Sequence, residues 1–97
     1  MSYIVSAEAE ADLEEIGDYI AQDNPARAVT FIDEIRARFE AIDRNPLACA
    51  ARPEVDPDVR ACVHGQYMIF YYVIGTTVEI ARVLHGARNL TRLFQSS

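Results

Sequence analysis

Two apolar stripes with helical spacing, separated by a short helix breaker, limit the possible folds of this chain more than any other feature. The stripe positions are Ala9, Leu13, Ile16 and Ile20, then Ala28, Ile32, Ile35, Phe39 and Ile42. Such spacing is typical of amphipathic helices. Ser6 is a suitable N-cap for a helix beginning at Ala7, and Asp23-Asn24-Pro25 ends that helix and starts another. Helices joined by so short a segment run antiparallel, so both stripes need a common third surface.

The C-terminal part of the chain supplies that surface as three β-type runs. They span residues 59–63, 66–74 and 77–84, with turns at His64-Gly65 and Gly75-Thr76. Turns this short make neighbouring strands antiparallel. The middle run carries apolar or aromatic residues at both parities, so both faces of the sheet need cover. Since the helical hairpin covers one face, we expect the other to be bare and to receive a partner.

Length and charge narrow the functional classes. The chain has 97 residues and no internal repeat, so we expect residues 1–97 to form a single domain. An irregular surface connection that ends at Asp58 joins the helical hairpin to the β-type runs. Fifteen acids oppose nine basic residues, all of them Arg, and the net charge of −6 argues against a general nucleic-acid binder. We also expect no direct sequence-specific DNA binding. The charge is uneven, because residues 59–97 hold one acid, Glu79, against four Arg. This part is therefore locally basic.

The cysteines and histidines indicate neither a disulfide framework nor a metal site. Cys49 and Cys62 are too few for such a framework, and no basic leader precedes an apolar segment, so we expect buried or half-buried thiols in a reducing cytoplasm. Neither these cysteines nor His64 and His85 have metal-ligand spacing, and the glycines are scattered. We therefore expect no metal and no cofactor. We also expect no membrane span, since the apolar run Met68–Ile74 has only seven residues.

Arg82 is the strongest candidate for a functional residue, because its permanent charge lies in the middle of the apolar run Ile80–Leu84. One alternative is an internal ion pair with an Asp or Glu of the helical hairpin, since buried Arg is nearly always paired. The other is a cationic patch, formed on one sheet face by Arg82, Arg60 and His85, that holds a phosphate or an acidic side chain. The sequence leaves both alternatives open.

The segment Ala81–Leu90, together with the order of elements, resembles the RelE/ParE superfamily of bacterial type II toxin–antitoxin toxins, and within it the ParE branch. Supporting segments are Ser6–Ile16, Asn24-Pro25, Asn45-Pro46 and Tyr67–Tyr71, so the resemblance spans nearly the whole chain. It implies an α+β fold of RelE/ParE type. In that fold an antiparallel sheet, made of an N-terminal edge strand at Tyr3–Val5 and the three-stranded C-terminal meander, is packed by the N-terminal αα-hairpin.

The resemblance also implies a function. Toxins of the ParE type are non-enzymatic poisons of DNA gyrase and form hetero-oligomers with a ParD-like antitoxin, a ribbon-helix-helix protein whose C-terminal segment wraps the toxin. We expect target contacts at Arg82, His85, Arg88, Arg92 and Phe94. We expect antitoxin contacts at Arg60, Tyr67, Tyr71 and Arg82.

The RelE branch offers an enzymatic alternative, because its members cleave mRNA on the ribosome. In that case Arg60 and Arg82 would steady the phosphate and His85 would act as acid or base. The absence of Lys, the lack of any Tyr after Tyr72 and the acidic charge weigh against it, although His85 keeps it open. A further alternative is an inactive homologue that only binds antitoxin.

Overall fold

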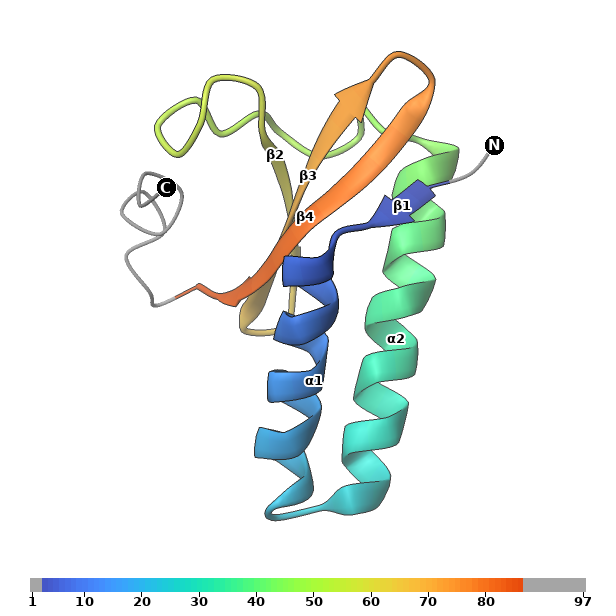
Figure 1. Cartoon of the computed structure of the whole chain (residues 1–97), viewed down its shortest axis with the longest axis vertical. Coiled ribbons are helices and arrows are strands. Elements are labelled where there is room, and N and C mark those ends of the chain that lie inside the picture. Colours follow the sequence, from blue (N-terminus) through green and yellow to red (C-terminus); the bar gives the residue numbers. More distant parts are fainter. Residues whose placement is uncertain (1–2, 87–97) are drawn as a thin grey trace.

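The computed structural model describes residues 3–86 and shows two helices packed on one face of a four-stranded sheet (Figure 1). The elements are β1 (Tyr3–Val5), α1 (Ala7–Ala21), α2 (Pro25–Arg44), β2 (Arg60–His64), β3 (Tyr67–Ile74) and β4 (Thr77–His85). The strand order in the sheet is β1-β4-β3-β2. This arrangement confirms the predicted α+β class and the αα-hairpin. Neither helix has the length and apolarity that a membrane crossing requires, within the part of the chain that is described.

Local capping explains where the two helices begin. The Ser6 Oγ accepts a hydrogen bond of 3.0 Å from the Ala9 amide, and the Asn24 side chain accepts one of 3.1 Å from the Arg27 amide. Both predicted starts are therefore confirmed. Most of the two apolar stripes is buried, while Ile20 and Ile32 are half-buried. Phe31, which the spacing did not include, joins the core.

The sheet is mixed, which corrects the expectation of an antiparallel one. β2, β3 and β4 form the predicted antiparallel meander, but β1 pairs with β4 in parallel, with Tyr3 opposite Val78. Everything between β1 and β4 acts as the long crossover that parallel pairing requires. Gly65 and Gly75, at φ of +60° and +63°, each take the first position of a two-residue turn, as type II′ hairpins favour.

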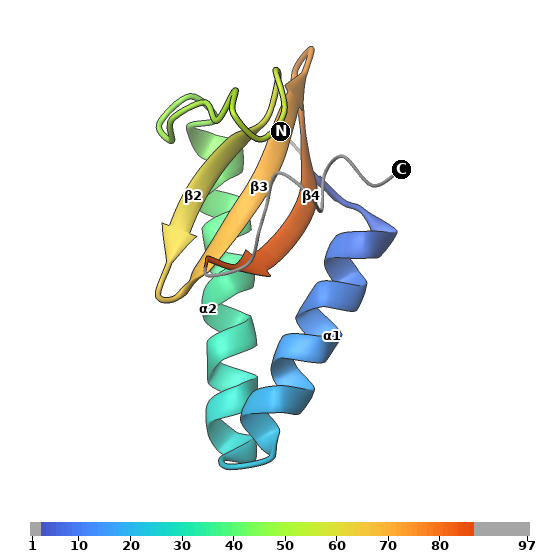
Figure 2. The same cartoon turned by 90° about the vertical axis from the view of Figure 1, so that its left-hand side faces the viewer.

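The second sheet face is not bare at its centre, so that expectation was wrong. Phe70 and Val59 are fully buried there and Leu84 is 2% exposed. Val55 packs against this cluster from the connection between α2 and β2, which Figure 2 shows curling beside the sheet. The sequence pattern indicated that this face needed cover, but an irregular segment gave no sign that it would contribute. Apolar exposure is greater near the tip of the β3–β4 hairpin, where Ile74 is 61% exposed.

A disulfide joins Cys49 to Cys62, so the expectation of two thiols was wrong. The connection doubles back along the outer edge of β2, where Ala51 pairs with Arg60 in an isolated antiparallel bridge. This brings the two cysteines, 13 residues apart in sequence, to a Cα separation of 5.4 Å, well within the range for a disulfide. A count of cysteines alone could not reveal this pairing, because the pairing depends on the path of the connection.

Candidate functional site

Arg82 forms an ion pair with Asp12 of α1, which supports the first of the two alternatives drawn from the sequence. Its Nε lies 2.8 Å from Asp12 Oδ2 and its Nη2 lies 3.0 Å from Asp12 Oδ1. The hydrogen bond to this carboxylate raises the pKa of Arg82, against the opposing effect of burial. Asp12 Oδ2 also accepts a hydrogen bond of 3.0 Å from the Val83 amide. One buried carboxylate therefore satisfies both a side chain and a backbone donor of β4.

Asp12 reaches β4 because β1 is short. Parallel pairing with β1 ends at Ile80, and the chain then turns into α1 beside the uncovered edge of β4. Ser6 begins this contact, since its amide donates to the Ile80 carbonyl at 2.9 Å and its Oγ donates to the Ala81 carbonyl at 2.8 Å. Ser6 and the first turns of α1 therefore complete the hydrogen bonding of an edge beside which no strand lies within residues 3–86.

A β-bulge in β4 sets the direction of its side chains. Tyr71 pairs with Ile80 and Phe70 pairs with Arg82, so Ala81 is the extra residue. The bulge moves Arg82 to the position opposite Phe70, on the second face of the sheet. From there its side chain reaches Asp12 beside the β4 edge, and simple alternation along the strand did not anticipate this shift.

Arg60 lies on the helix-covered face of the sheet, where it binds the connection between α2 and β2 rather than a ligand. It pairs with Tyr71, and its Nη1 donates a hydrogen bond of 2.7 Å to the Cys49 carbonyl. The Tyr71 hydroxyl donates one of 2.6 Å to the Pro46 carbonyl. Burial raises the pKa of Tyr71, with the Arg60 charge acting in the opposite direction. Both side chains fasten the start of the connection to the sheet.

His85 lies at the far end of the sheet from Arg60, so the predicted cationic patch of Arg60, Arg82 and His85 does not form. The His85 ring meets Tyr67 edge to face at 5.4 Å between centroids, and its Nε2 lies 3.3 Å from Gln66 Oε1. By strand register, His85 and Arg60 share the helix-covered face while Arg82 lies on the second face. The three side chains therefore do not converge on one phosphate.

A groove of about 600 Å³ opens between α1 and the end of β4. Its described lining includes the carboxylates of Asp12, Glu15 and Asp18 and the rings of Tyr19, Tyr67 and His85. Tyr19 is 68% exposed at its mouth. The Asp12 charge is paired with Arg82, and Asp18 adds further negative charge to the groove. Such a lining suits a peptide segment with basic and apolar side chains better than an anion.

Comparison with known proteins assigns this fold to a family. The sequence profile described as the ParE toxin of type II toxin-antitoxin system, parDE, matches residues 3–90. The chain belongs to the ParE toxin family. Toxin ParE1 of Caulobacter vibrioides (strain ATCC 19089 / CIP 103742 / CB 15) is 34% identical over 88 residues, which cover 90% of this chain and 91% of that relative.

A solved structure points to the same family. It is described as the chromosomal ParDE TA system from P. aeruginosa, and it is similar with a TM-score of 0.76 and 25% sequence identity. The similarity covers 88% of this chain and 95% of that chain. The ParE-branch resemblance drawn from the segment Ala81–Leu90 is thereby confirmed, and the protein is a toxin of the ParE type.

The contacts expected from the ParE resemblance are only partly compatible with the structure. Tyr71 is fully buried on the helix-covered face and is not available to an antitoxin, whereas Tyr67 is half-buried and lines the groove. The expected target contacts Arg88, Arg92 and Phe94 lie outside the described residues. Asp12, Asp18 and Tyr19 were not selected from the sequence, because a groove between α1 and β4 depends on tertiary packing.

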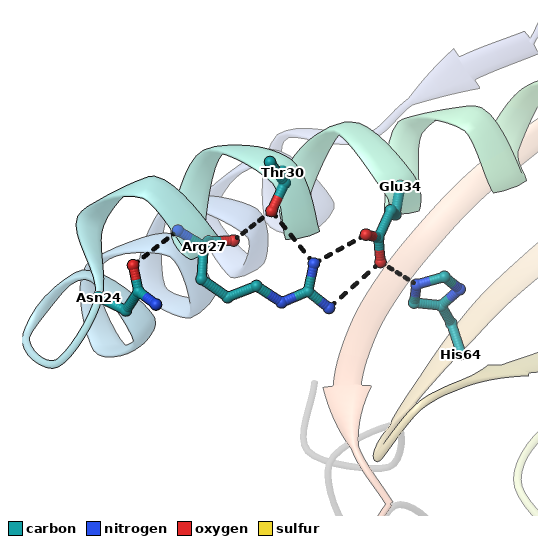
Figure 3. Close-up of polar contacts among 5 residues, drawn as sticks. All are labelled: Asn24, Arg27, Thr30, Glu34 and His64. Carbon is teal, nitrogen blue, oxygen red and sulfur yellow. Dashed lines mark hydrogen bonds and ion pairs between the residues drawn. The ribbon is translucent and has the colours of Figure 1, made fainter.

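A second polar cluster links α2 to the end of β2, as Figure 3 shows. The Arg27 guanidinium donates to Glu34 at 2.7 and 3.3 Å and to Thr30 at 3.1 Å, and His64 Nε2 lies 3.6 Å from Glu34 Oε1. The hydrogen bond from Arg27 lowers the pKa of Glu34. These side chains of Arg27 and Glu34 are nearly half exposed, so the cluster adds little to stability. Within residues 3–86, no three His, Cys, Asp or Glu side chains gather as metal ligands would.

Proposed function

We propose that this toxin acts in the cytoplasm as a poison of DNA gyrase and is held inactive by a ParD-type antitoxin. Membership of the ParE family supports this proposal, as does the description of the P. aeruginosa neighbour as a ParDE system. The structural observation that favours gyrase over RNA as the target is the ion pair between Arg82 and Asp12. Arg82 is bound by a carboxylate and lies on the opposite sheet face from Arg60 and His85. It is therefore poorly placed to steady an RNA phosphate together with them.

The test of the target is a supercoiling and cleavage assay with purified gyrase and the full chain. We expect supercoiling to fall and linear plasmid DNA to accumulate, and both effects to disappear after preincubation with equimolar antitoxin. Gyrase that is unaffected at toxin concentrations that stop growth would contradict the proposal.

Separate experiments test the two remaining alternatives, RNA cleavage and an inactive homologue. Primer extension on translated mRNA after induction should show no new cleavage sites. New sites would instead assign the toxin to RNA cleavage, with His85 as the first residue to substitute. Normal growth on expression without antitoxin would indicate an inactive homologue that only binds its partner.

We propose that the groove between α1 and β4 receives part of the antitoxin. Tyr19 offers a large exposed ring at the mouth, and Asp18 adds negative charge beside it. A segment with an apolar side chain flanked by Lys or Arg complements both features. Tyr19→Ala should weaken antitoxin binding by tenfold or more, while Val29→Ala, at a 63% exposed position on α2, should not change it. Equal affinities of the two variants would overturn this placement.

A further inference from the structure

The Cys49–Cys62 disulfide joins two segments that are also held together without it. Arg60 and Tyr71 donate hydrogen bonds to the carbonyls of Cys49 and Pro46, at 2.7 and 2.6 Å. The Ala61 amide donates one of 3.2 Å to the Ala50 carbonyl. The main core is built from α1, α2 and the sheet, and it contains fully buried side chains from both helices. A domain with such a core does not need a covalent staple to fold, so both redox states are accessible to it.

The two cysteines differ in their exposure to solvent. Cys62 is 2% exposed and belongs to the helix-covered core together with Ile69. Cys49 is half-buried, because it packs against the same core from the connection, outside the helices and strands. Thiol–disulfide exchange needs access to one of the two sulfurs, so Cys49, the more exposed of the two cysteines, is the better point of attack.

We propose that Cys49 and Cys62 form a reversible redox site that exchanges with small thiols of the glutathione type. A thiolate attacks Cys49 Sγ and forms a mixed disulfide, the Cys49–Cys62 bond breaks, and Cys62 leaves as a thiolate that takes a proton from water. A second thiolate then attacks the sulfur of the bound thiol, which leaves oxidised glutathione in solution and a Cys49 thiolate that takes up a proton. Oxidation follows the same steps in reverse, with oxidised glutathione as the oxidant.

The bond controls how firmly the connection is held against the sheet. In the oxidised protein a covalent link to β2 and hydrogen bonds from β2 and β3 both hold it to the sheet, and in the reduced protein only the hydrogen bonds and packing remain. The same connection carries Val55, which packs over the buried cluster of the second face. Reduction therefore loosens the cover of that face without dismantling the helix-covered core, and this effect does not depend on which molecule the toxin targets.

The first test titrates the bond in the full chain. Protein equilibrated in glutathione buffers of graded reduced-to-oxidised ratio is quenched with acid, alkylated and analysed by mass spectrometry. We expect a reversible transition between fully oxidised and fully reduced protein. We also expect the melting temperature of the reduced form to be lower by roughly 10 to 20 °C, because the link constrains a short loop of the unfolded chain. Failure of the bond to form at any ratio, or its survival in the most reducing buffer, would overturn the proposal.

Single variants test which sulfur is reactive. In Cys62→Ser the remaining Cys49 should be alkylated in the native protein, whereas in Cys49→Ser the remaining Cys62 should react only after denaturation. Equal native rates would overturn the assignment of Cys49 as the point of attack. The double variant Cys49→Ser/Cys62→Ser should fold and melt close to the reduced wild type in every buffer. A double variant that does not fold would show a purely structural bond and would also overturn the proposal.

Discussion

Among the acidic residues of α1, one aspartate differs in environment from its neighbours. The sequence places Glu10, Asp12 and Glu14 together outside the apolar stripe, where all three are expected to be solvated. In the structure Asp12 is 9% exposed and binds both Arg82 and the Val83 amide, while Glu10 and Glu14 remain exposed. The sequence showed that Arg82 needed a partner. It could not name the partner, because Asp12 lies 70 residues away and reaches Arg82 only through the packing of α1 on β4.

We predict that Asp12→Ala lowers the free energy of unfolding by about 2 to 3 kcal/mol, because it leaves a half-buried Arg82 and the buried Val83 amide unpaired. The matched control is Glu10→Ala, which removes a carboxylate of the same helix from a pair with Arg36 whose side chains are 45% and 49% exposed. That change should cost less than about 1 kcal/mol. Urea unfolding of the two variants measures the difference. Similar losses in both would mean that burial does not distinguish the two pairs.

At the scale of elements, the sequence predicts which helices and strands exist better than it predicts how the strands pair. Caps at Ser6 and Asn24 and the glycine turns are local signals, and the helices and the meander follow from them within a residue or two. The bulge at Ala81 and the parallel pairing of β1 depend on neighbouring strands, so no local pattern could reveal them. The same holds for the connection, whose contribution to the second face depends on the placement of Val55.

Tyr72 makes the contact between that connection and the sheet sensitive to alkaline pH. Burial, with Asp56, Asp58 and Glu79 nearby, raises the pKa of Tyr72 from 10.0 to about 12. In the unfolded chain this tyrosine ionises near pH 10, and in the folded chain it stays neutral until about pH 12. Its contribution to stability is therefore complete below pH 10 and is lost between pH 10 and 12.

We predict that Tyr72→Phe reduces the loss of stability between pH 10 and 12, because phenylalanine does not ionise in either state. Denaturant unfolding at constant temperature across this range measures the effect. The matched control, Tyr19→Phe, removes a hydroxyl from a tyrosine that is 68% exposed and should follow the wild-type curve. An alkaline loss of equal size in Tyr72→Phe and the wild type would contradict the role assigned to Tyr72.

At the scale of the whole molecule, charge and shape together suggest how the toxin selects a partner. The net charge of −6 is concentrated in the helical hairpin and the connection after it, since residues 1–58 hold 14 of the 15 acids. Part of that charge lines the groove between α1 and β4, where it lies beside aromatic rings. Under the proposed placement of the antitoxin, a basic partner segment is attracted to the hairpin over a distance and is then held in the groove by contact. The two effects respond differently to salt.

A pair of charge reversals separates the two effects. Asp18→Arg, in the groove, and Glu40→Arg, on an exposed part of α2, each raise the net charge of −6 by two units. Both should slow association with a ParD-type antitoxin to a similar extent at low salt, because long-range attraction depends on total charge. Only Asp18→Arg should also speed dissociation, with an affinity loss of about tenfold or more that persists at high salt, because it places a like charge against the bound segment. Surface plasmon resonance over a range of salt concentrations measures both rates. If Glu40→Arg speeds dissociation as much as Asp18→Arg, the antitoxin does not use this groove, and the acidity of the hairpin acts only at a distance.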